Sequence, residues 1–252
     1  MTKPRVAIFD FACCEGCQLQ IVNLDEDLLN LIQVVEPVEW REAMSEKNGE
    51  FDIAIVEGAI TRAEDEERLK AIRRRAGILV ALGSCATHGG VNRLKNRFAM
   101  EEVKRTVYGE SAGLPHLDTA PTRAVHEVVP VDVKIPGCPI EREEFCRVIR
   151  ELALGRKPFL PNYPVCVECK LRETVCRYEF NEICLGPITR AGCNARCPSH
   201  GKPCVGCRGP VDNPNLNAAH EIMEKYGKTL EDLREKLALF WTGEEGVNGR
   251  GD

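Results

Sequence analysis

Cysteine is the residue that most constrains how this chain can fold, because fourteen cysteines occur within 252 residues. Eight of them lie from Cys166 to Cys207, inside a segment (residues 157–214) that is also rich in proline and glycine. This segment shows hardly any helical or strand periodicity, so we expect that it cannot bury an apolar core. Bound metal is then expected to order it, as in other small units whose folding is coupled to ligation.

Disulfide bonds are the other use for so many cysteines. The chain starts MTKPRVAIFD, which runs directly into a strand-like pattern without a signal-peptide core or a twin-arginine leader. We therefore expect a cytoplasmic protein, in a compartment where disulfide frameworks are rare. No stretch approaches the roughly 18 consecutive apolar residues of a membrane helix, so no membrane association is expected.

The charge balance argues against a nucleic-acid partner. The net charge is -5 and no basic stripe is present, whereas proteins that bind phosphate backbones carry clustered lysine and arginine. The charged run RAEDEERLKAIRRR is expected to form a solvated helix face with no chemical role.

Short apolar runs alternate with helical patterns over residues 1–156. This alternation predicts an α/β domain, a flavodoxin-like doubly wound parallel sheet. A small irregular cysteine-rich domain (157–214) and two C-terminal helices with a frayed tail (215–252) should follow, with Gly227 ending one helix and Thr229 capping the next. Strands are expected at residues 5–10, 33–40, 51–56, 77–83 and 131–135, and helices near 18–31, 63–76, 97–107 and 140–154.

Four cysteines of the first domain follow predicted strands. In a doubly wound sheet, loops at the carboxyl ends of strands converge on one edge, so these cysteines can meet. Glycines in CEGC, GSCATHGG and IPGCP let the backbone approach a bulky inorganic cluster. The predicted four-thiolate set is Cys14, Cys17, Cys85 and Cys138.

Other interpretations of this set stay open. A tetrahedral zinc site also takes four thiolates, and a CxxC redox pair could lie beside two structural cysteines. Cys13 could compete with Cys17 as a ligand, whereas Cys146 lies within a helical pattern and is expected to be a packed thiol. His88 is expected to make a polar contact or a hydrogen bond to a sulfide, not to ligate metal.

The second domain carries a more specific pattern of two four-cysteine groups, enough for two further clusters. Two zinc ribbons are the alternative, although the acidic balance disfavours it because such ribbons often serve nucleic acid. His200, between two of the cysteines, is expected to face solvent. The groups are Cys166, Cys169, Cys176 and Cys184, then Cys193, Cys197, Cys204 and Cys207.

The motifs CEGC, GSCATHGG, PGCP and CLGPITRAGCNARCPSHGKPCVGCRGP together resemble the small subunit of nickel-iron hydrogenases. The resemblance covers about residues 6–210. It is strongest to the cytosolic branch, which contains the sulfhydrogenase delta subunit and relatives linked to NAD(P), coenzyme F420 or heterodisulfide.

This resemblance implies an electron-transfer subunit with three 4Fe-4S clusters and no hydrogen-activating metal of its own. The nickel-iron site would lie in a separate large subunit, and a flavin/iron-sulfur (diaphorase-type) partner would reduce NAD(P) or a similar low-potential carrier. The ligand sets implied are proximal Cys14, Cys17, Cys85 and Cys138; distal Cys166, Cys169, Cys176 and Cys184; and medial Cys193, Cys197, Cys204 and Cys207.

Two positions separate this chain from the membrane-bound and periplasmic branch, which has a histidine in place of Cys166 and a proline in place of Cys197. Complex I subunits and the cyanobacterial NAD-reducing type resemble the first domain alone. The alternatives are a zinc-binding scaffold and a complex I-like, quinone-linked subunit. From the resemblance, the edge bearing Glu15, Gly58 and His88 is expected to face the large subunit.

Overall fold

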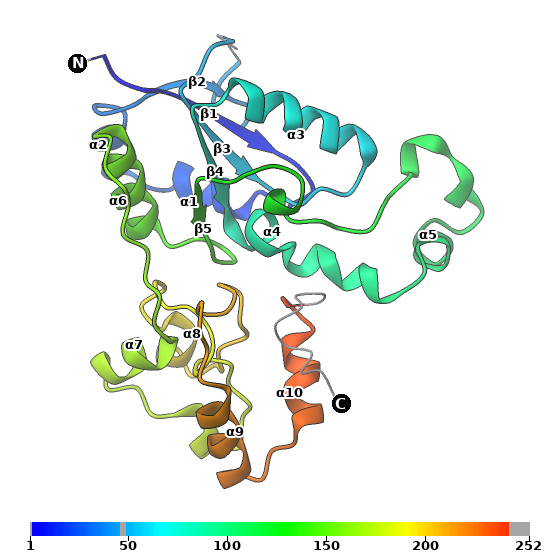
Figure 1. The fold of residues 1–252 in the computed structure, drawn as a ribbon, viewed down its shortest axis with the longest axis vertical. Helices are drawn as coiled ribbons and strands as arrows, with labels where there is room; N and C mark the ends of the chain where they lie inside the picture. Colours follow the sequence, from blue (N-terminus) through cyan, green and yellow to red (C-terminus); the bar gives the residue numbers. More distant parts are fainter. Residues whose placement is uncertain (1, 46–48, 242–252) are drawn as a thin grey trace.

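The computed structural model describes residues 2–45 and 49–241, and the tail expected to be frayed lies outside them. The first domain is built on a parallel sheet with strand order β2-β1-β3-β4-β5 (Figure 1). This is the flavodoxin-like order, so the predicted fold class is confirmed. The strands are β1 Arg5–Asp10, β2 Glu36–Trp40, β3 Ile53–Glu57, β4 Ile78–Leu82 and β5 Val133–Ile135.

Helices cover both faces of this sheet, because alternate side chains of each strand point to opposite faces and both sets are apolar. Ile53 and Ile55 of β3 pack on one face with α1, α2 and α6, while Ala54 and Val56 pack on the other with α3. The first-domain helices are α1 Gly16–Val22, α2 Glu26–Leu31, α3 Ala63–Arg75, α4 Gly83–His88, α5 Met100–Tyr108 and α6 Arg142–Ala153. The 3-10 turns are η1 Gly90–Arg97, η2 Gly109–Gly113, η3 Pro115–Leu117, η4 Val125–Glu127 and, in the second domain, η5 Arg177–Phe180.

Two details of the first domain differ from the sequence prediction. The helix predicted at 18–31 is two helices, because Asp25 between them has a positive φ of 53° that a continuous helix excludes. The short helix α4 was missed, since it follows β4 directly and is too short to show a periodic pattern. The charged run forms α3 as predicted, with Leu69 and Ile72 buried and a Glu66–Lys70 ion pair on its exposed face.

The cysteine-rich segment does bury apolar side chains, so the prediction that it lacks a core was wrong. The C-terminal helices supply much of that core, including Met223, Phe240 and Trp241. The Nε1 of Trp241 donates to the carbonyl of Gly206 at 2.7 Å and ties the C-terminal helices to the cysteine loops. The second-domain helices are α7 Val165–Leu171, α8 Arg196–Ser199, α9 Leu216–Lys225 and α10 Leu230–Leu237.

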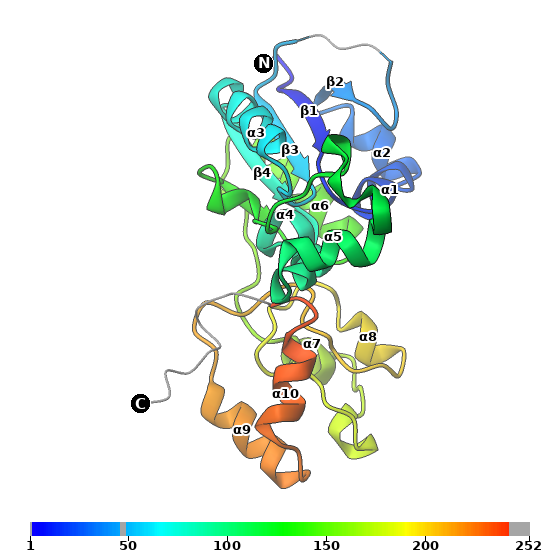
Figure 2. The same cartoon turned by 90° about the vertical axis from the view of Figure 1, so that its right-hand side faces the viewer.

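The predicted cap of the last helix is confirmed. Thr229 accepts from the backbone N–H of Asp232, whose carboxylate accepts from Thr229 in return. Figures 1 and 2 show the second domain against the end of the first domain where α4 lies. Across residues 2–45 and 49–241, no helix has the length and apolar character needed to cross a membrane.

Candidate iron-sulfur sites

The four strand-end cysteines of the first domain line one cavity of about 260 Å³ at the carboxyl edge of the sheet. They come from separate elements: the loop before α1, α1 itself, α4, and the loop after β5. The order of the parallel strands brings these loops together, although they are more than 100 residues apart in sequence at the extremes. The cysteines that share this cavity are Cys14, Cys17, Cys85 and Cys138.

Glycines bring the backbone close to these sulfurs. A Cβ at Gly16 would lie 3.3 Å from Cys14 Sγ, and one at Gly90 would lie 3.1 Å from Cys85 Sγ. Gly83 has a φ of +80°, and a Cβ there would overlap Cys17 Sγ. Any other residue at these positions would therefore displace the thiols or strain the backbone.

The room between the sulfurs bears on which group they can hold. With a Zn–S distance of about 2.3 Å, four thiolates around one zinc ion would nearly touch and leave no cavity. Within residues 2–45 and 49–241, no three His, Cys, Asp or Glu side chains converge tightly enough to hold a single metal ion. Four thiolates around an open cavity with glycine-lined walls fit a larger iron-sulfur cluster.

The two remaining cysteines of this domain lie outside the cavity lining. Cys13 is half-buried, and burial, followed by the charge of Glu57, raises the pKa of its thiol to about 12. Cys146 is buried in the core beneath α6, as expected for a packed thiol. Cys17 lines the cavity and Cys13 does not, which favours Cys17 as the candidate ligand.

Glu57 is a site residue that sequence reasoning missed. Its buried carboxylate accepts the backbone N–H groups of Cys17 at 3.0 Å and Gln18 at 3.2 Å, which orients the start of α1. It also lines the cavity. Its position in the sequence could have identified it, because a carboxylate ends an otherwise apolar strand. A charge buried there without a partner is costly.

Four cysteines of the second domain surround another cavity of about 330 Å³. Burial raises the pKa of Cys166 to about 12 and that of Cys169 to about 11. Thiols with such pKa values keep their protons at neutral pH, so iron must displace protons to bind. The four cysteines are Cys166, Cys169, Cys176 and Cys184.

Hydrogen bonds connect two of the last four cysteines to these two sets. A backbone hydrogen bond from Cys138 favours the thiolate of Cys207, although burial raises its pKa to about 12 overall. The backbone N–H of Cys204 donates to Cys184 Sγ at 3.2 Å. Cys207 thus adjoins the first-domain set and Cys204 adjoins the other second-domain set. The third group comprises Cys193, Cys197, Cys204 and Cys207.

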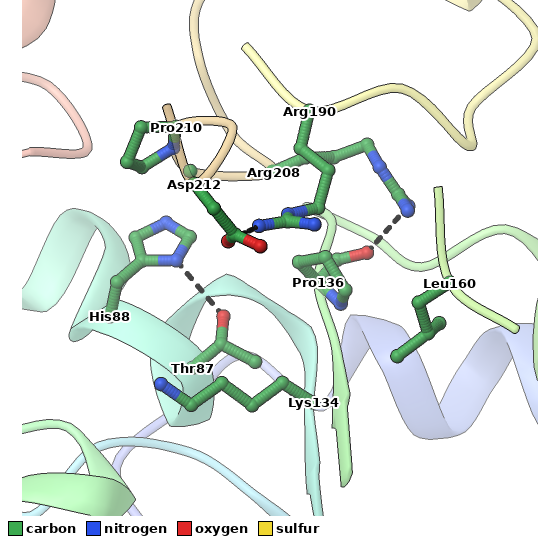
Figure 3. Close-up of a pocket in the computed structure, with 10 residues that line it drawn as sticks. Thr87, His88, Lys134, Pro136, Leu160, Arg190, Arg208, Pro210 and Asp212 are labelled. Carbon is green, nitrogen blue, oxygen red and sulfur yellow. Dashed lines mark hydrogen bonds and ion pairs between the residues drawn. The ribbon is translucent and has the colours of Figure 1, made fainter. Parts of the chain in front are cut away.

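The two histidines considered above differ in burial: His88 is buried and His200 is exposed. His88 points into a separate cavity between the domains, beside Arg190 and Arg208 (Figure 3). Its Nδ1 donates to Thr87 Oγ1 at 2.9 Å, because that hydroxyl already gives its proton to the carbonyl of Gly83. The expected polar contact is therefore present, to a hydroxyl. His200 is exposed, as expected.

The predicted large-subunit surface needs correction at two of its three residues. His88 and Gly58 are buried in the chain, the former against Phe240 with ring centroids 6.4 Å apart. The turn after α10 that carries Phe240 could not be placed against His88 from sequence. Glu15 keeps 32% of its side chain exposed and remains available to a partner.

His88 should make stability depend on pH. Burial lowers its pKa from 6.5 to about 3, so the unfolded chain binds more protons between these values and stability falls as the pH falls. From about pH 7 to pH 5, we expect the free energy of unfolding to drop by about 2 kcal/mol through this group. His88→Gln should remove that part of the drop in anaerobic thermal unfolding, and His200→Gln should not. If His88→Gln keeps the wild-type pH dependence of stability, His88 is not the group responsible for that part of the drop.

Several known proteins are similar to this chain. The family described as "NADH ubiquinone oxidoreductase, 20 Kd subunit" matches residues 14–152. Sulfhydrogenase 2 subunit delta of Pyrococcus furiosus is 39% identical over 94% of this chain and 98% of its own length. A subunit of the F420-non-reducing hydrogenase vhu of Methanococcus voltae is 32% identical over 94% of each chain.

A solved structure matches only part of this chain. A chain in the crystal structure of an NAD+-reducing [NiFe]-hydrogenase in the H2-reduced state is 33% identical, with a TM-score of 0.58. It matches 64% of this chain but 96% of its own length. The match is thus about as long as the first domain, whereas the two relatives above extend over nearly the whole chain.

Proposed function

This chain belongs to the family of hydrogenase subunits that includes sulfhydrogenase subunit delta, and from that premise we propose that it relays electrons through three 4Fe-4S clusters. It is a subunit of an oxidoreductase that acts on H2. The proposed partner on one side is a large subunit with the nickel-iron site. On the other side is a flavin/iron-sulfur protein that uses NAD(P) or a similar low-potential carrier.

One observation carries this proposal: two four-cysteine sets line cavities at the sheet edge and in the second domain, and Cys207 and Cys204 of the third group adjoin one set each. Each cluster, when bound, supplies a one-electron redox centre. The first-domain set would hold the proximal cluster, Cys193 to Cys207 the medial cluster, and Cys166 to Cys184 the distal cluster. A compact chain of this length is about 45 Å across, too far for one electron hop, so intermediate centres are needed.

Exposed apolar side chains lie at both ends of this series. Leu19 on α1 is 51% exposed and lines the proximal cavity, a position suited to contact with the large subunit. At the distal end Val175, which lines the second cavity, is 53% exposed, and Leu171 and Phe180, near it in the sequence, are 79% and 55% exposed. We assign this end to the electron-accepting partner.

The second domain also bears on the number of clusters. The NAD+-reducing hydrogenase chain matches only about the extent of the first domain, whereas sulfhydrogenase and F420-non-reducing relatives match both. The eight additional cysteines therefore argue against a complex I-like subunit with one cluster. A cytoplasmic location remains a prediction from the sequence.

Anaerobic purification with the co-expressed large subunit tests the proposal. We expect a brown complex with about twelve irons on this chain, four for each of three clusters, and paramagnetic signals from iron-sulfur centres on reduction by H2. A colourless protein with stoichiometric zinc would instead favour the zinc-binding scaffold. A count near four irons would restrict the relay to the proximal cluster.

A further inference from the structure

A buried carboxylate links the distal and medial cysteine groups. Glu168 lies on α7 between two distal cysteines, and its residue is 8% exposed. Its Oε1 accepts the backbone N–H of Gly192 at 2.7 Å, and its Oε2 accepts that of Ala195 at 2.9 Å. The same Oε2 lies 3.8 Å from Cys193 Sγ. Glu168 therefore holds both sides of the loop that carries the first medial cysteine.

A buried guanidinium holds the same loop from the side of the first domain. Arg208 follows Cys207, and its side chain is 1% exposed. Its Nε donates to the carbonyl of Ala191 at 2.8 Å, and its Nη1 donates to the carbonyl of Pro136 at 2.7 Å (Figure 3). Arg208 thus connects the loop before Cys138 to the loop before Cys193.

The two buried charges differ in their counter-charges. Nη2 of Arg208 donates to both carboxylate oxygens of Glu144 at 2.8 Å, so this pair is close to neutral. Glu168 forms no ion pair within residues 2–45 and 49–241, where its oxygens accept from two backbone N–H groups and the Cys193 thiol. One uncompensated negative charge is left beside the medial cysteines.

We propose that Glu168 is a positioning residue that holds the Cys193 loop and keeps the reduction potential of the medial cluster low, with Arg208 and Glu144 as a neutral clamp on the same loop. This inference rests on the proposed function, because it requires a cluster on the medial cysteines. A nearby negative charge opposes the one electron that arrives from the proximal side and leaves toward the distal side, so it lowers the potential. Burial keeps water and salt from screening this effect.

Redox titration of the intact hydrogenase complex, followed by electron paramagnetic resonance, tests the inference. Glu168→Gln should favour the reduced medial cluster at least about tenfold, a rise of about 59 mV for one electron. Glu168→Asp keeps the charge and should restore the wild-type potential. Glu235→Gln removes an exposed carboxylate of the C-terminal helices and should leave the potential unchanged. The isotope exchange between H2 and deuterated water that the large subunit catalyses should stay at the wild-type level in all three variants.

A wild-type medial potential in Glu168→Gln with full iron content would overturn the inference. If that variant fails to assemble the cluster, Glu144→Gln decides instead: it leaves Arg208 without its counter-charge and should also raise the potential. No rise in Glu144→Gln would then overturn the inference. Wild-type protein without iron on the medial cysteines would refute the proposed function, a separate outcome visible before any variant is made.

Discussion

Replacement of Cys138 by serine is expected to abolish electron transfer from hydrogen. Cys138 is the one proximal cysteine that follows β5, and it lines the cavity with Cys14, Cys17 and Cys85. A serine hydroxyl is a harder and more weakly acidic ligand than a thiol, so iron would lose one corner of its site. The loss of H2-dependent dye reduction should exceed the roughly 10- to 100-fold effects of changes to residues that only support a metal ligand.

Cys146→Ala is the matched control for this variant, because it removes a buried thiol from α6 that lies outside the cavity. It should cost about 1 kcal/mol of stability and leave electron transfer intact. The isotope exchange between H2 and deuterated water should persist in Cys138→Ser if the large subunit still assembles. This readout distinguishes loss of electron transfer from loss of the active site. Normal dye reduction by Cys138→Ser with full iron content would overturn the proximal assignment.

Replacement of Cys197 by proline is expected to convert the medial cluster to a three-iron form. Cys197 lies in the first turn of α8, where proline is tolerated because amides there lack an acceptor within the helix. Without its fourth thiolate the medial group should hold three irons, so the chain should lose about one of the twelve irons proposed for it. Cluster type and charge help set the potential, which should rise and favour hydrogen oxidation with high-potential dyes.

Electron paramagnetic resonance of the oxidised, air-free complex measures this change. The variant should show a three-iron signal that the wild type lacks, and Cys197→Ala should show the same signal without the backbone effect of proline. A three-iron signal in intact wild type, or none in both variants, would refute Cys197 as a ligand. The Cys197 and Glu168 variants should both raise the medial potential, but only the former should change the iron count.

Local patterns in the sequence were enough for the strands, most of the first-domain helices and the cap at Thr229. Apolar runs of strand length separated by helical patterns specify a parallel sheet, and a parallel sheet brings strand-end loops to one edge. For that reason the grouping of Cys14, Cys17, Cys85 and Cys138 could be predicted before the cavity they share was known. The break at Asp25 could not, since a positive φ there is set by local backbone conformation that periodicity does not report.

The amino-acid sequence by itself determined the fold class of this protein and the cysteines available to it as ligands, because both depend on residue type and spacing. Only the tertiary structure decided what surrounds those cysteines. The C-terminal helices that complete the second core, the burial of His88 behind Phe240, and the buried side chains of Glu57, Glu168 and Arg208 all depend on contacts between segments distant in the chain. A charged side chain is expected from sequence to be solvent-exposed, and the partners that offset the cost of burying it are brought to it only when the chain is folded.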